Sequence, residues 1–156
     1  MTLIQLPGIT LPVDLSAPMY VNSHFTWGEF TRDGERMPAN TVFGGITIPA
    51  AQIVANGLKI ARELDKIRSQ FGDRPIAVTS WLRPPAINRA VGGVPESQHI
   101  IGWAADIQID GYEPHDVAAR LSPTWAGGLG DSISFTHLDL RQLMGHASAR
   151  WDYGFA

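Results

Sequence analysis

The fold of this chain is decided by one stretch, Ser97-Gln98-His99-Ile100-Ile101-Gly102-Trp103-Ala104-Ala105-Asp106. From Trp103 to Ile109 the residues are mostly apolar and partly β-branched, which predicts a short buried strand. His99 precedes this strand in a loop that Gly102 allows to turn sharply. A loop histidine and a strand aspartate can therefore point to the same place, which two ligands on one rigid strand could not do.

A second segment, Ile133–Leu140, is also predicted to be a strand, and its second half alternates in polarity. Because successive side chains of a strand point to opposite faces, Phe135, His137 and Asp139 share one face. We therefore expect His137 and Asp139 to point into the same space.

His99, Asp106 and His137 are all good ligands for a divalent metal. Two imidazole nitrogens and one carboxylate oxygen suit Zn²⁺, and three protein ligands leave a fourth coordination position for water. An open position is typical of a catalytic rather than a structural zinc, so the pattern indicates hydrolysis.

The motif Ser-x-His-x-x-Gly-x-Ala-x-Asp followed by His-x-Asp resembles the zinc peptidases of the D-Ala-D-Ala carboxypeptidase/dipeptidase group, peptidase family M15, of the type found in phages or cyanobacteria. Further segments match in the same order, and together they cover roughly residues 23–156. These segments are Phe25–Phe30, Pro75–Pro85, Asn88–Gly93 and Arg150–Trp151.

The resemblance implies an α+β fold of the hedgehog/DD-peptidase type, a single domain with a small, mostly antiparallel sheet flanked by helices. Residues 1–22 are predicted to be an N-terminal arm or packing strand, and residues 23–156 the peptidase domain. The remaining elements are read from hydrophobic spacing and from Pro and Gly punctuation. They are a loop around residues 34–45, a helix over 49–70, a strand over 76–80, a short helix from Pro84 to about 92, a helix over 114–121 and a glycine loop over 127–130.

Two residues near the predicted metal ligands are candidates for binding substrate. Arg83 ends a predicted buried strand, and the resemblance places it in the cleft, where its guanidinium would bind a substrate carboxylate or stabilise an oxyanion. Ser97 has two equally good interpretations, a hydrogen bond to substrate or the start of the turn that carries His99. His146 has weaker support as a substrate contact.

The general base is less clear from the sequence. In the dipeptidase branch of the family an acid lies three residues before the second histidine, but here that position is Ser134. Asp139 is the nearest alternative, as a base that activates the attacking water or as an acceptor that orients a ligand imidazole. Asp131 is a third candidate, and Glu29 is expected to be structural.

Composition narrows the class of partner. The 156 residues carry a net charge of −3 with 17% charged and 44% hydrophobic residues, and the arginines are scattered, so no nucleic-acid footprint is evident. There is no cysteine and no apolar run long enough to insert into a membrane. Residues 1–8 lack the basic segment of a signal peptide. For a wall-cutting enzyme this indicates a phage lysin, released from the host cytoplasm through a holin or carried on the virion.

We therefore predict a zinc-dependent peptidase that cleaves the D-Ala-containing stems or cross-links of peptidoglycan, as a carboxypeptidase or an endopeptidase. It would be a phage endolysin or a tail-associated lysin. The alternative is a non-catalytic component of a virion tail or baseplate that contacts other tail proteins and keeps the metal for stability. Ser134, in place of the expected acid, motivates that alternative.

Overall fold

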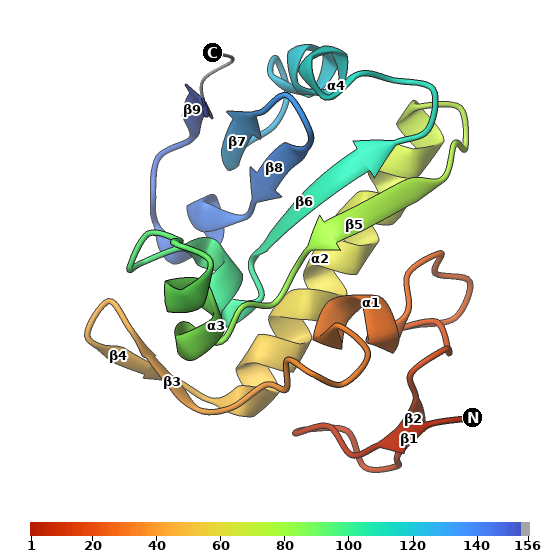
Figure 1. Cartoon of the computed structure of the whole chain (residues 1–156), viewed down its shortest axis with the longest axis vertical. Helices are drawn as coiled ribbons and strands as arrows, with labels where there is room; N and C mark the ends of the chain where they lie inside the picture. The colour runs from red at the N-terminus through yellow and green to blue at the C-terminus, as the bar shows by residue number, and fades with distance from the viewer. Residues whose placement is uncertain (154–156) are drawn as a thin grey trace.

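The computed structural model describes residues 1–153 and is built around a five-stranded sheet in the order β5-β6-β8-β7-β9 (Figure 1). All neighbours pair antiparallel except β7 and β9, which are parallel. The predicted mostly antiparallel sheet is thus confirmed. Its strands are β5 (Ile76–Ser80), β6 (Ala104–Ile109), β7 (Gly128–Asp131), β8 (Thr136–Asp139) and β9 (Ala149–Asp152).

Helices complete the α+β domain. They are α1 (Trp27–Thr31), α2 (Ala50–Gln70), α3 (Pro85–Ala90) and α4 (Pro114–Leu121), with two 3₁₀ turns, η1 (Gln98–Ile101) and η2 (Arg141–Met144). In Figure 1 the long α2 passes behind β5 and β6, and α4 packs against β6, β7 and β8. No helix within residues 1–153 is long and apolar enough to cross a membrane.

Helix α2 follows its predicted bounds within a residue and buries one face against the core. Ile53, Gly57, Ile60 and Leu64 all lie on its buried face. Gly57 has a specific role, since a Cβ atom there would lie 2.4 Å from Cε1 of Phe30. The glycine therefore lets the ring of Phe30 rest directly on the helix backbone.

The N-terminal segment packs against the rest of the domain. Its two short strands, β1 (Leu3–Ile4) and β2 (Val13–Asp14), pair with each other, and Leu6 is buried in the core. The carboxylate of Asp65 on α2 accepts hydrogen bonds from the hydroxyl groups of Tyr20 and Ser23. Residues 1–24 are thereby tied to the longest helix of the fold.

Helix α1 was not predicted, although the sequence carries its signal. Thr26 accepts a hydrogen bond from the backbone N–H of Glu29, and Glu29 accepts one from the N–H of Thr26. This reciprocal pair is a capping box, which satisfies two donors at a helix start. The structural role expected of Glu29 is confirmed.

The loop prediction is wrong for two segments, which contain strands. Residues 34–45 include β3 (Thr41–Phe43), which pairs with β4 (Ile46–Ile48) across Gly44 and Gly45. Both glycines have positive φ, 58° and 79°, as a two-residue hairpin turn of type I′ requires. The glycine loop at 127–130 is largely β7, which runs between β8 and β9.

The predicted strand over 133–140 is too long at its start. Ile133 is 73% exposed and precedes β8, which begins at Thr136 where pairing with both β6 and β7 starts. The faces within β8 follow the prediction. Leu138 is fully buried in the core, whereas Phe135, His137 and Asp139 line the cleft.

Candidate metal centre

Sheet register brings two of the predicted ligands together. Asp106 on β6 lies directly opposite His137 on β8, and Asp106 Oδ1 is 2.9 Å from His137 Nδ1. His99 approaches from η1, with its Nε2 atom 3.1 Å from the same oxygen. One ligand atom from each of these three buried residues lies within 4.8 Å of the others. The structure therefore assembles the cluster predicted from the sequence.

The turn that presents His99 is fixed at both ends. Ser97 starts η1, and its hydroxyl accepts a hydrogen bond from the N–H of His99 at 3.3 Å. Gly102 ends the turn with a φ of 75°, as its left-handed cap position favours. The carbonyl of His99 also accepts from the N–H of Arg83 at 2.9 Å, which ties the turn to the end of β5.

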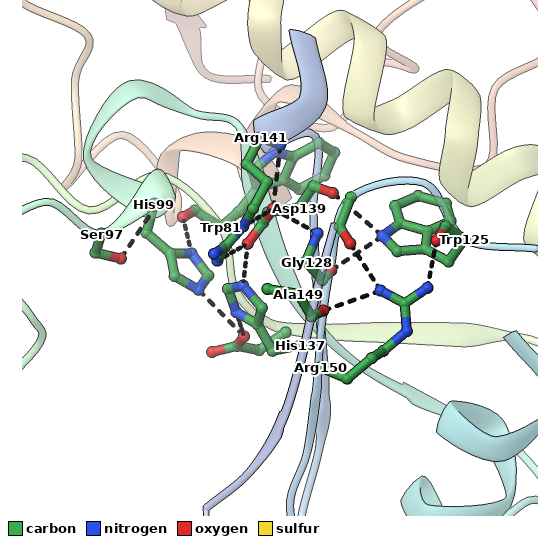
Figure 2. A network of polar contacts seen from close by, with 12 residues as sticks. Trp81, Ser97, His99, Trp125, Gly128, His137, Asp139, Arg141, Ala149 and Arg150 are labelled. Atoms are coloured by element: carbon green, nitrogen blue, oxygen red, sulfur yellow. Dashed lines mark hydrogen bonds and ion pairs between the residues drawn. The ribbon is translucent and has the colours of Figure 1, made fainter. Parts of the chain in front are cut away.

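The remaining ring nitrogens are held by acceptors. His99 Nδ1 lies 2.6 Å from the carbonyl oxygen of Trp81, and His137 Nε2 lies 2.9 Å from Asp139 Oδ2 (Figure 2). Each of these nitrogens must carry a proton to donate, so in the neutral imidazoles the opposite nitrogens present lone pairs. Those lone pairs point at the carboxylate of Asp106.

Such a set of donors fits a cation. Two nitrogen lone pairs and a carboxylate oxygen repel one another unless a positive charge lies among them. Their separations of 2.9 and 3.1 Å approach the roughly 3.4 Å between neighbouring ligands of a tetrahedral zinc. Burial alone would raise the pKa of Asp106, and positive charge at its partners, His99 and His137, lowers it. A cation held among the three residues would supply that positive charge and keep Asp106 ionised.

Asp139 is fully buried and every side of its carboxylate is occupied. Besides His137, it accepts from the N–H of Gly128 at 2.9 Å and from the Nε and Nη2 atoms of Arg141 at 2.9 and 2.8 Å (Figure 2). Burial opposes ionisation, but these donors hold the pKa of Asp139 well below its usual range. Of the two roles left open by the sequence, this geometry supports orientation of His137 rather than proton transfer.

The cluster opens into a cleft of about 990 Å³. Arg83, Ser97 and His146 all line it, as predicted for residues near the substrate. Arg83 is half-buried, and its Nε atom has no hydrogen-bond partner within the described residues. Burial lowers its pKa, and the nearby Asp106 opposes this shift.

Two positions considered for the general base lie outside the cleft. Asp131 lines a separate surface depression, where its carboxylate is 2.6 Å from Nδ1 of His115. Ser134 is exposed on another surface, and its carbonyl accepts from the side chain of Gln108. An acid at position 134 would therefore not face the metal ligands of this chain.

Sequence reasoning missed several cleft residues. Glu96 is an exposed carboxylate beside Ser97, and Trp151 on β9 places its ring 5.1 Å from that of His137. Of these two residues, only Trp151 could have been found from the sequence, because the segment Arg150–Trp151 resembles family M15. Arg150 itself is structural, since its guanidinium donates to the carbonyls of Gly127 and Ala149 (Figure 2).

Comparison with known proteins agrees with this geometry. The family model for Peptidase M15 matches residues 23–139, a range that contains all three candidate ligands. A zinc D-Ala-D-Ala carboxypeptidase of Streptomyces albus G is 34% identical over 84 residues, which are 54% of this chain. The match spans 31% of the length of that relative. The chain belongs to peptidase family M15.

Proposed function

We propose that this chain is a zinc-dependent peptidase that cleaves D-Ala-containing peptides of bacterial peptidoglycan. The observation that carries the proposal is the buried cluster of His99, Asp106 and His137 at the base of a cleft. Membership of family M15 and the similarity to a zinc D-Ala-D-Ala carboxypeptidase support the metal and the substrate class.

Each residue of the site has a distinct role in the proposed hydrolysis. Bound zinc would polarise the scissile carbonyl and lower the pKa of water. His99, Asp106 and His137 hold the ion, and Asp139 fixes the orientation of His137. Arg83, half-buried and without a carboxylate partner in the described chain, supplies positive charge where the oxyanion develops or where a terminal carboxylate binds.

The proton must be accepted by a group that can exchange it with the cleft. Glu96 and His146 line the cleft, are exposed, and are not tied into the ligand network. They are therefore better placed for proton transfer than the enclosed Asp139. Loss of turnover with retained zinc in Glu96→Gln or in His146→Ala would identify the acceptor.

The non-catalytic alternative was motivated by Ser134, which stands where the dipeptidase branch has an acid. Because Ser134 lies outside the cleft, the lack of an acid at this position is no argument against catalysis. Cleavage of a terminal D-Ala and cleavage of an internal cross-link both remain predictions, as do the endolysin and virion roles. The products of the reaction separate the two modes of cleavage.

Digestion of purified peptidoglycan fragments, followed by mass spectrometry, tests the proposal. Loss of one D-Ala indicates a carboxypeptidase, and conversion of cross-linked dimers to monomers indicates an endopeptidase. Either product should be absent with His99→Ala and present with Asp131→Asn, a matched variant outside the cleft. No product from zinc-loaded wild-type protein would contradict the proposal and favour the structural role.

A further inference from the structure

One wall of the cleft carries three arginines, Arg32, Arg36 and Arg83, in a protein whose net charge is −3. Within residues 1–153 no carboxylate lies at ion-pair distance from any of these three guanidinium groups. The three guanidinium groups therefore line the space where substrate would bind without a direct carboxylate partner in this range, although Asp106 and Glu35 act on Arg83 and Arg36 from a longer distance.

The three arginines influence one another and the metal ligands. Arg83 interacts electrostatically with Asp106 and His99. Partial burial and the charges of Arg32 and Arg83 lower the pKa of Arg36, and the charge of Glu35 opposes this shift.

Arg32 and Arg36 are held in place by carbonyl groups of the segment that precedes Arg83. Arg32 donates from Nη1 to the carbonyl of Thr79 at 3.2 Å, and Arg36 donates from Nη1 to the carbonyl of Leu82 at 3.4 Å. Each guanidinium is thereby anchored through one nitrogen. Its other donors remain free of hydrogen-bond partners in the described structure and are available to a ligand.

The backbone that presents Arg32 is unusual for a non-glycine residue. Arg32 caps α1 with a φ of 52°, and Asp33 follows with a φ of 55°, although glycine is favoured at such a cap. Buried Thr31 holds this turn. Its hydroxyl group accepts a hydrogen bond from the backbone N–H of Gly34, and its carbonyl accepts one from the backbone N–H of Arg36. Strained conformations of this kind concentrate at functional sites.

We propose that Arg32 and Arg36 form a subsite for a carboxylate of the substrate peptide, distinct from the group bound by Arg83. This inference rests on the proposed peptidase function and adds that the preferred substrate is an acidic peptide. Guanidinium groups bind carboxylates through paired, charge-assisted hydrogen bonds, so replacement of the carboxylate by a carboxamide should weaken binding.

Matched peptides test the subsite. The first set consists of acetylated tetrapeptides that end in D-Ala-D-Ala and carry either glutamate or glutamine at the first or second residue. The second set has the same sequences with a reduced scissile bond, so that these peptides bind but cannot be cleaved. For wild-type protein, glutamine in place of glutamate should raise KM, and the Kd of the uncleavable peptide, by about tenfold with kcat little changed. In Arg32→Gln/Arg36→Gln the difference should disappear.

Arg74→Gln is the control, because it removes the same charge from an exposed residue outside the cleft and should keep the preference. The two single variants should give intermediate shifts, and they serve as the test if the double variant does not fold. Equal affinity for both peptides in wild type, or a preference that survives the double variant, would overturn the subsite. Binding with this preference but without cleavage would support the subsite and contradict the proposed peptidase function.

Discussion

The imidazole of His137 donates from Nε2 to Oδ2 of Asp139 across 2.9 Å, and both side chains project from the same face of β8. This hydrogen bond leaves Nδ1 of His137 as the atom that faces Asp106. A partner that fixes the tautomer and direction of a ligand imidazole strengthens metal binding. The buried carboxylate of Asp139 is therefore expected to affect how tightly the centre binds its metal.

Asp139→Asn should lower the affinity for zinc by about 10–100-fold, because the acceptor that orients His137 is weakened. Activity should fall in step with zinc content and recover in part with excess zinc. Titration with a competing chelator, alongside turnover, checks this. Asp131→Asn is the matched control. Full zinc occupancy with lost activity would instead assign proton transfer to Asp139.

Arg83→Gln should reduce turnover by about 10²–10³-fold while zinc content stays stoichiometric, if its guanidinium stabilises the developing oxyanion. A rise in KM with kcat unchanged would indicate that it binds a ground-state carboxylate instead. Steady-state kinetics on a D-Ala-D-Ala peptide separates these results, with Arg74→Gln as the control. An unchanged kcat/KM would remove Arg83 from the site.

Asp65→Asn should lower the free energy of unfolding by about 1–2 kcal/mol at pH 7, because the carboxylate accepts from Tyr20, Ser23 and His24. Burial alone would raise the pKa of Asp65, but these donors lower it. A carboxyl group whose pKa is lower in the folded state stabilises the fold above the unfolded pKa of about 4, and this stabilisation is lost as pH falls through the folded value.

The measurement for Asp65 is urea unfolding of wild type and variant between pH 7 and pH 2.5. The difference between the two proteins should be full at pH 7 and shrink below about pH 4. Asp110→Asn, at a side chain that is 70% exposed, serves as the control and should show little difference at any pH. A difference for Asp65→Asn that does not vary with pH would contradict the ionised contact.

Gly57→Ala should destabilise the protein by about 1–3 kcal/mol, since the new methyl group would overlap the ring of Phe30. Intrinsic helix propensity alone would favour alanine by about 1 kcal/mol, so the sign of the change distinguishes the two effects. Denaturant unfolding gives the value. Combination with Phe30→Leu should make the alanine less harmful, whereas a stabilised single variant would show that the contact is not tight.

The elements that could be predicted are those whose signal is local. The bounds of β5 and α4 agree with the sequence prediction because an apolar run and a proline at the helix start define them. The convergence of His99 with Asp106 was likewise predictable from one glycine turn beside one buried strand. The direct pairing of Asp106 with His137 was not, because register depends on how β6 and β8 meet.

The missed elements depend on tertiary contacts. Strand β7 is glycine-rich and so lacks a strand signal in the sequence, but a Cβ at Gly128 would lie 2.4 Å from Oδ2 of Asp139. Glycine is therefore required by close packing, which a local pattern cannot reveal. The same holds for Arg32 and Arg36, whose place in the cleft depends on carbonyls of a distant strand end.

The central claim is that His99, Asp106 and His137 hold one zinc ion. Metal analysis of purified protein by mass spectrometry, after dialysis against zinc, tests it most directly. Wild type and Asp131→Asn should bind one equivalent, and His99→Ala and His137→Ala should each bind far less while remaining folded by circular dichroism. One full equivalent of zinc in both folded histidine variants would contradict the assignment.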